Sequence, residues 1–102
     1  MRSILFDNDS ADRLLCINGR RIPVHSLLLS LRSSVLKRIM FSNIYKYEIN
    51  INDEDEESFA QMIRFIYTDD VIDEKYLVNL IILGHRYRVK ITNYVIAFIN
   101  LF

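Results

Sequence analysis

The stretch DRLLCINGRRIPVHSLLLSLRSSVLKRIM, residues 12–40, decides the fold. Two short apolar runs flank Asn18 and Gly19. This pair is typical of a two-residue hairpin turn, because both residues tolerate the positive φ angles of a type I′ turn. The sequence therefore predicts an antiparallel hairpin over residues 14–24. Pro23 has no N–H to donate, so we expect the return strand to lie at an edge of its sheet or to end near Pro23.

After His25 the pattern becomes helical. Ser33 and Ser34 interrupt it and favour a new helix start, since serine side chains accept hydrogen bonds from free backbone N–H groups. We therefore predict two short helices, over about residues 25–31 and 34–41. Apolar residues that recur at three- and four-residue steps mark the expected stripe: Leu28, Leu31, Val35 and Ile39, with Leu29, Leu36 and Met40 beside them.

The rest of the chain alternates between strand and helix signals. Residues 47–51 alternate apolar and polar, which predicts a half-buried strand. The acidic run that follows predicts a helix start, with Asp53 as its cap and Glu56 at the capping-box spacing. The apolar stripe of this helix is Phe59, Met62, Ile63 and Ile66.

Towards the C-terminus we predict a very short strand at residues 71–72 and two more helices. Asp73 is expected to cap the first, and Thr92 the second. Their inner faces would carry Leu77, Leu80 and Ile81, and then Val95, Phe98, Ile99 and Phe102. A small sheet of a hairpin plus a third strand, with helices clustered against it, is an α+β fold.

Composition limits the function classes. The chain has 102 residues, of which 51% are hydrophobic, so we expect one domain over residues 1–102 with a real core. Thirteen basic residues balance thirteen acidic ones, which gives no overall attraction to nucleic acid or an anionic membrane. No apolar run approaches the roughly 20 residues that span a bilayer. We expect a soluble intracellular domain, cytoplasmic, nuclear or both.

Catalytic and metal sites find no support in the residue pattern. A catalytic histidine needs a nucleophile and an orienting acid, and no glycine-rich elbow surrounds the serines near His25. Cys16, His25 and His85 lack zinc-ligand spacing, and Cys16 is expected to be a small core residue. The acidic run 53–57 has no glycine for a calcium loop. We predict no enzyme activity and no cofactor, and a structural role for His25.

The order and spacing of these features resemble the BTB/POZ domain family, in the short form found in MATH-BTB and Kelch-BTB adaptors. The resemblance covers residues 11–101 and implies the α+β BTB/POZ fold. It implies structural roles for Asp12, Gly19, His25 and Asp53. The pieces that carry it are Asp12, Asn18-Gly19, His25-x-x-x-Leu29, Ser33-x-Val35, Glu48–Asp53, Phe65–Thr68 and Leu77–Tyr87.

Two functions are implied by this resemblance. The first is an interaction domain that self-associates and serves as substrate adaptor for a cullin-based ubiquitin ligase, so its partners are a second copy and a cullin. The alternative is a purely architectural oligomerisation module, of the transcription-regulator or channel-assembly type, without cullin binding. An enzyme is a distant third.

The resemblance also implies which residues meet these partners. Family members dimerise through a helix ahead of the first strand, and the segment 1–11 is expected to be a truncated form of it. The candidate dimer interface is Ile4, Leu5 and Phe6. The candidate cullin-facing residues are Phe41, Ile44, Tyr45, Tyr67 and Asp69. The family's glutamate two positions after a hydrophobic anchor is absent, because Asn43 and Lys46 stand there.

Overall fold

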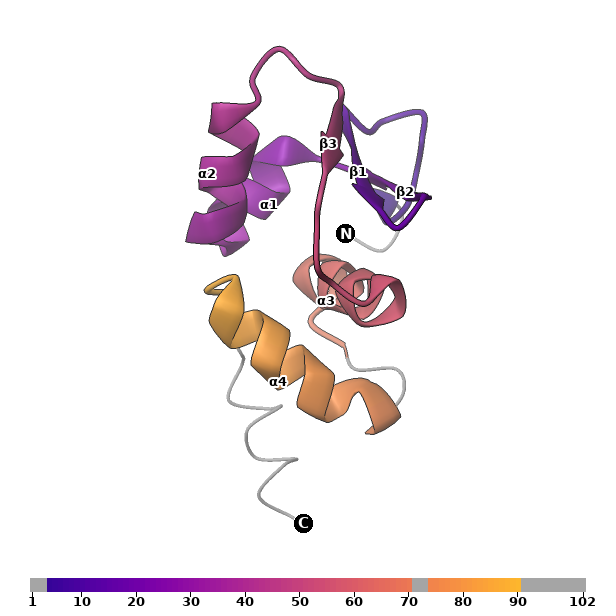
Figure 1. Cartoon of the computed structure of the whole chain (residues 1–102), viewed down its shortest axis with the longest axis vertical. Coiled ribbons are helices and arrows are strands. Elements are labelled where there is room, and N and C mark those ends of the chain that lie inside the picture. The colour runs from indigo at the N-terminus through magenta and orange to yellow at the C-terminus, as the bar shows by residue number, and fades with distance from the viewer. Residues whose placement is uncertain (1–3, 71–73, 91–102) are drawn as a thin grey trace.

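The computed structural model describes residues 4–70 and 74–90 of the chain. Its elements build an α+β fold in which helices gather beside and below a small sheet (Figure 1). In chain order the elements are β1 (Arg13–Ile17), β2 (Arg20–Val24), α1 (Ser26–Arg32), α2 (Ser34–Ser42), β3 (Glu48–Asn50), α3 (Glu56–Thr68), the 3₁₀ helix η2 (Glu74–Tyr76) and α4 (Leu77–Arg86).

The sheet has three strands in the order β2-β1-β3. Strands β1 and β2 form the predicted hairpin, and Asn18 and Gly19 adopt φ angles of 51° and 84° at its turn. Pro23 lies in β2, which is an edge strand, as expected of a residue without an N–H. The parallel pairing of β1 with β3 places Leu15 opposite Ile49.

One face of the sheet is buried, and the other is partly open. Leu15 and Ile17 point inward and are fully buried. Cys16 points the other way, is half-buried, and stands opposite Arg21 and Asn50 in the sheet register. The expectation that Cys16 is a core residue was wrong, because no described helix covers the outer face of this strand (Figure 1).

Helix α3 supplies the centre of the core. Its Phe59 and Phe65 are fully buried, and the Phe59 ring meets Tyr87 edge-on with 5.4 Å between ring centroids. Edge-on aromatic pairs add to the stabilisation that burial provides. The predicted inner stripe is confirmed as fully buried at Phe59, Met62, Ile63 and Ile66.

The first turn of α3 corrects one prediction. Its N-cap is Asp55, whose carboxylate accepts hydrogen bonds from the Ser58 amide (3.0 Å) and hydroxyl (2.9 Å). Asp53 is exposed, has a φ angle of 63°, and does not cap the helix. Asp55 has the extended backbone that lets a side chain reach back to the first free amides. The predictions at residues 71–73 and from Thr92 onward lie outside the described residues.

The joint between α1 and α2 is at Ser33, as predicted. Its extended backbone ends α1, and its hydroxyl oxygen accepts a 3.0 Å hydrogen bond from the Leu36 amide at the start of α2. The same hydroxyl donates to the Tyr87 carbonyl, and Ser33 forms an isolated bridge with Val89. A residue 54 positions away in the chain therefore fixes where the helix pair bends.

The buried stripe of this helix pair is shifted from the predicted one. Leu29, Leu36 and Met40 are buried, whereas Leu31 is 74% exposed. The predicted members Leu28, Val35 and Ile39 are only half-buried. Leu29, Leu36 and Met40 each follow a predicted member by one position, so the buried face of both helices is turned by one residue from the predicted stripe.

Candidate protein-interaction surfaces

His25 sits at the strand-to-helix joint and is held by groups from three segments. Its backbone N–H donates to the Tyr67 hydroxyl (2.8 Å), and its Nδ1 lies 2.7 Å from the same oxygen. Its Nε2 lies 2.8 Å from the Ser10 hydroxyl, which donates to the Asp7 carboxylate at 2.8 Å. Next to it, the Asp12 carboxylate accepts a 2.8 Å hydrogen bond from the Ser26 amide at the start of α1.

The order of this network differs from that of a catalytic triad. A triad places histidine between the nucleophile and the acid, so that it can remove the nucleophile's proton. Here the Ser10 hydroxyl stands between Asp7 and His25 and gives its proton to Asp7. The assignment that satisfies every group makes Nε2 a donor to Ser10 and Nδ1 an acceptor from Tyr67. The network joins the N-terminal segment, α1 and α3, which is a structural role for His25.

The C-terminal end of α2 carries exposed aromatic and aliphatic side chains. We call Phe41, Ile44, Tyr45 and Tyr47 the loop patch; each is at least half exposed, and Tyr45 is 98% exposed. Large apolar side chains that gather on a surface are typical of protein-binding sites. Three of the five predicted cullin-facing residues therefore lie together on this patch, namely Phe41, Ile44 and Tyr45.

The loop patch is held in place by Arg13, a residue that sequence reasoning missed. Its guanidinium donates to the carbonyl groups of Met40 (3.3 Å), Asn43 (3.2 Å) and Ile44 (3.3 Å). The Met40 carbonyl also accepts from the Asn43 amide, and the Asn43 carbonyl from the Lys46 amide, so the guanidinium adds a link from β1 to the end of α2 and the loop that follows it. No local pattern indicated this link, because the two segments are about 30 positions apart in the chain.

The other two predicted cullin-facing residues do not join the loop patch. Tyr67 is only 3% exposed, because its ring packs in the core and its hydroxyl bonds His25. Its assignment as a surface contact was wrong. Asp69 is exposed, but it ends α3 with a left-handed backbone and forms a 2.6 Å ion pair with Arg32.

The candidate dimer residues Ile4, Leu5 and Phe6 are half-buried and pack against the core. They form a short turn, in which the Asp7 amide donates to the Ile4 carbonyl at 3.2 Å. Further exposed apolar side chains, which the sequence did not single out for binding, lie on α1 and α4. They are Leu27 and Leu31 on α1, and Val78 and Ile82 on α4.

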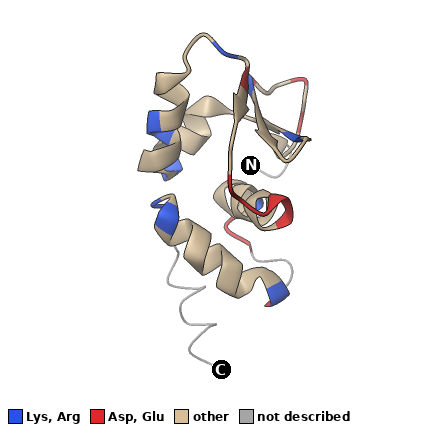
Figure 2. Ribbon diagram, in the orientation of Figure 1, with Lys and Arg blue, Asp and Glu red and all other residues tan. Residues whose placement is uncertain are grey.

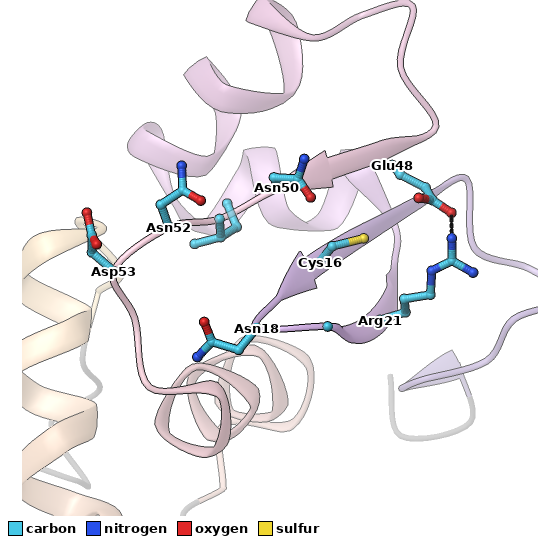
Figure 3. A pocket seen from close by; sticks show the side chains of 9 residues that line it. Cys16, Asn18, Arg21, Glu48, Asn50, Asn52 and Asp53 are labelled. Carbon is cyan, nitrogen blue, oxygen red and sulfur yellow. Dashed lines mark hydrogen bonds and ion pairs between the residues drawn. The ribbon is translucent and has the colours of Figure 1, made fainter.

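A polar hollow lies over the open face of the sheet (Figure 3). Cys16 and Asn18 from β1 and its turn, and Asn50 and Asn52 from β3 and beyond, line it, and the Arg21–Glu48 ion pair closes one side. Within the described ranges no group of three metal-binding side chains comes together, and no helix is long and apolar enough to cross a membrane. The hollow therefore presents amides and one ion pair rather than a catalytic constellation.

Comparison with known proteins identifies the family. The model of the BTB/POZ domain matches residues 5–94. The chain is 25% identical to Kelch-like protein 40 of Xenopus tropicalis over 93 residues, which cover 87% of this chain and 15% of that protein. It is also 25% identical to BTB/POZ domain-containing protein 9 of Rattus norvegicus, over 83% of this chain and 15% of that protein.

Solved structures agree on the fold. The BTB domain of human gigaxonin matches with a TM-score of 0.67 at 17% identity, over 80% of this chain and 70% of that one. The BTB domain of zebrafish PATZ1 matches with a TM-score of 0.67 at 16% identity, over 86% and 70%. The chain belongs to the BTB/POZ domain family, whose members are interaction modules and not enzymes. It spans about 15% of the length of the curated relatives it matches.

Proposed function

We propose that this BTB/POZ domain self-associates and docks a cullin scaffold through the loop patch, as the adaptor of a ubiquitin ligase. The observation that carries the proposal is the loop patch itself, because Ile44 and Tyr45 stand exposed on a segment that Arg13 anchors. Aromatic and aliphatic anchors provide most of the energy of protein interfaces. The similarity to a Kelch-like protein supports the same partner. The proposal places the chain inside the cell, in the cytoplasm, the nucleus or both.

A pull-down with the N-terminal part of a cullin tests this proposal. Ile44→Asp puts a charge into the centre of the loop patch and should reduce binding by about tenfold or more, because a buried interface charge without a partner is costly. Val78→Asp is the matched control, since Val78 is 65% exposed on α4, away from the loop patch. Binding that Ile44→Asp leaves unchanged would contradict the assignment of this surface.

Self-association is proposed to use Ile4, Leu5 and Phe6, which already lie half-buried against the core. Leu5→Asp should lower the molecular mass that light scattering measures at a given concentration. Circular dichroism must show an unchanged helix content, because Leu5 also contacts the core. A well-folded variant with the mass of the wild type would exclude this segment from the interface.

The second candidate is an architectural oligomerisation module without cullin binding. One observation favours it: Asn43 and Lys46 stand where a glutamate is expected two positions after the anchors Phe41 and Ile44. Losing one charge-assisted hydrogen bond costs about 1.5–3 kcal/mol, enough to weaken a transient interface strongly. Self-association together with no cullin in the pull-down would support this second function and exclude the first.

A further inference from the structure

The neutral net charge conceals a strong separation of charge along the chain. Every charged residue from Arg13 to Tyr47 is basic, and every charged residue from Glu48 to Glu57 is acidic. In the fold, Lys and Arg residues gather on α2 and at the end of α4, whereas Asp and Glu residues gather where the chain enters α3 (Figure 2). The two groups therefore occupy different elements of the surface.

The basic group lies along α2 and beside its first residue. Lys37, Arg38 and Phe41 come from α2, and Arg88 and Lys90 follow α4; we call these five residues the basic patch. The bridge between Ser33 and Val89 brings the two segments together. Phe41 is 62% exposed, and the Lys37 ammonium lies 5.9 Å from its ring centroid.

Arg20, Arg21, Arg32 and Arg86 form ion pairs with carboxylates. Within residues 4–70 and 74–90, Lys37, Arg38, Arg88 and Lys90 have no carboxylate partner. Cations without a partner among these residues, with one of them against an exposed ring, are complementary to an acidic surface that also offers apolar contact.

The same chain carries such a surface at the start of α3. We call it the acidic hollow, a depression of about 230 Å³ lined by Asp53, Glu54, Asp55, Ser58, Asn79, Ile82, Leu83 and Arg86. Glu54 is only 8% exposed, and one of its oxygens pairs with Arg86. Its other oxygen, Oε2, is buried and accepts no hydrogen bond of standard geometry from the described residues, and the Glu54 carboxylate contributes, after burial, to raising the pKa of the Tyr87 hydroxyl. The three carboxylates of the lining outnumber its single Arg86, and this excess of negative charge favours a cation from outside.

We propose that the acidic hollow of one copy receives the basic patch of a second copy, so that the chain self-associates head to tail. The cations of the basic patch would meet Asp53 and Glu54, and Phe41 would contact the exposed Ile82 at the rim of the hollow. Because the contact joins two different surfaces, each pair leaves one basic patch and one acidic hollow free. The contact can therefore be repeated from copy to copy, and it gives a ring where the rotation between copies closes and an open chain where it does not.

This contact is independent of the proposed self-association through Ile4, Leu5 and Phe6. That interface is apolar, whereas the head-to-tail contact depends on charges at the surface. Salt screens such charges, since the Debye length falls from about 10 Å at 0.1 M to about 3 Å at 1 M ionic strength. The head-to-tail contact should therefore be lost at high salt. The molecular mass measured at high salt then serves as the baseline, because it reports only association through the apolar interface.

Complementation between two variants tests the proposal. Lys37→Glu/Arg38→Glu removes the basic patch and keeps the acidic hollow. Asp53→Asn/Asp55→Asn neutralises the hollow and keeps the basic patch, and asparagine tolerates both a positive φ and an N-cap position. Sedimentation velocity at low salt should show that the assemblies of the wild-type protein become larger as the protein concentration rises. Each variant alone should stay at the high-salt baseline, and their mixture should form a complex of one copy of each.

Single substitutions provide the matched control. Lys37→Glu and Lys46→Glu change the net charge equally, but Lys46 lies on the loop after α2, outside the basic patch. Lys37→Glu should weaken low-salt association by about tenfold, and Lys46→Glu should have little effect. Failure of the two well-folded double variants to associate when mixed would overturn the proposal, as would wild-type association that salt does not change. Either result leaves the cullin and Ile4–Phe6 experiments unaffected.

Discussion

A single buried hydroxyl, that of Tyr67, serves two groups of His25. It accepts from the His25 amide and lies 2.7 Å from Nδ1 of the ring. The hydroxyl joins the last turn of α3 to the start of α1, two elements that approach each other only in the folded chain. Removing one partner of a buried hydrogen bond costs more than the bond itself contributes, because the group that remains stays desolvated.

Tyr67→Phe should therefore lower the free energy of unfolding by about 1–3 kcal/mol, measured by urea denaturation near neutral pH. The substitution keeps the ring and removes only the hydroxyl. Tyr45→Phe is the control, because Tyr45 is 98% exposed and its hydroxyl remains in water. Equal stability changes in the two variants would show that the Tyr67 hydroxyl is not important to the fold.

The same hydroxyl makes stability depend on alkaline pH. Burial raises the pKa of Tyr67 from its ordinary value of 10.0 to about 12. A group whose pKa is raised on folding stabilises the protein fully below its unfolded pKa. This stabilisation is lost as the pH rises from about 10 to about 12. Tyr67→Phe should therefore show a smaller loss of stability over this interval than the wild type does.

Asp55 should make the stability of the fold depend on acid pH, the opposite end of the pH range from Tyr67. Hydrogen bonds from the Ser58 amide, and then from its hydroxyl, hold the pKa of Asp55 below its ordinary value of 3.8. Its contribution is present above that value and is lost as the pH falls through the lower folded pKa. Asp55→Ala should be less stable at neutral pH and should lose less stability on acidification, measured by urea denaturation over a pH series.

Asp55→Asn separates the cap from the charge, since asparagine accepts the same hydrogen bond but does not ionise. We expect it to retain more of the neutral-pH stability than Asp55→Ala, with the same weakened acid dependence. If both variants lose as much stability on acidification as the wild type does, carboxylates other than Asp55 cause that loss.

At the scale of elements, the bend between α1 and α2 determines which helix faces meet the core. Ser33 is buried and connects three segments: it ends α1, caps α2 through the Leu36 amide and donates to the Tyr87 carbonyl. Leu27 and Leu31 lie one turn apart on α1 and are both 74% exposed, whereas Leu29 between them is buried. Leu31 therefore belongs to the outer face of α1.

Ser33→Ala should lower the free energy of unfolding by about 2 kcal/mol, since it removes both the cap and the donor to a distant carbonyl. The measurement is urea denaturation monitored by circular dichroism. Ser34→Ala, at the exposed first residue of α2, should change stability by less than about 0.5 kcal/mol. Comparable effects of the two substitutions would contradict the role of Ser33 as the joint.

At the scale of the whole molecule, long-range contacts connect the sheet to the surfaces that meet partners. Arg13 in β1 anchors the segment that carries Ile44 and Tyr45. The joint at Ser33 and Val89 likewise assembles the basic patch from α2 and the residues after α4. Binding surfaces of this kind depend on folding to bring distant segments together.

Arg13→Lys should loosen the loop patch without unfolding the domain. Lysine keeps the charge, but its single ammonium does not reproduce the planar fork that reaches three carbonyls. Hydrogen exchange should become faster at residues 43–47 and stay unchanged in α3, as measured by mass spectrometry. Arg38→Lys, on the outside of α2, is the matched control. Unchanged exchange in Arg13→Lys would show that the loop is ordered by its own contacts.

Local patterns in the sequence were enough to determine the elements. The hairpin at Asn18-Gly19, the edge strand with Pro23, the helix break at Ser33 and the buried stripe of α3 are all confirmed. Each of these depends on the φ preferences, capping groups or apolar spacing of residues close together in the chain. The BTB/POZ family was recognised for the same reason, since its pieces keep their order and spacing.

Only the tertiary structure decided which side chains face solvent. Tyr67 is buried because it packs in the core beside the His25 joint, Cys16 is half-open because no described helix covers its face, and Leu31 is exposed because it lies on the outer face of α1. The cap at Asp55 likewise depended on the path by which the chain leaves β3. At these positions exposure is set by neighbours that lie far away in the chain, so the local apolar spacing that identified the stripe of α3 was not enough.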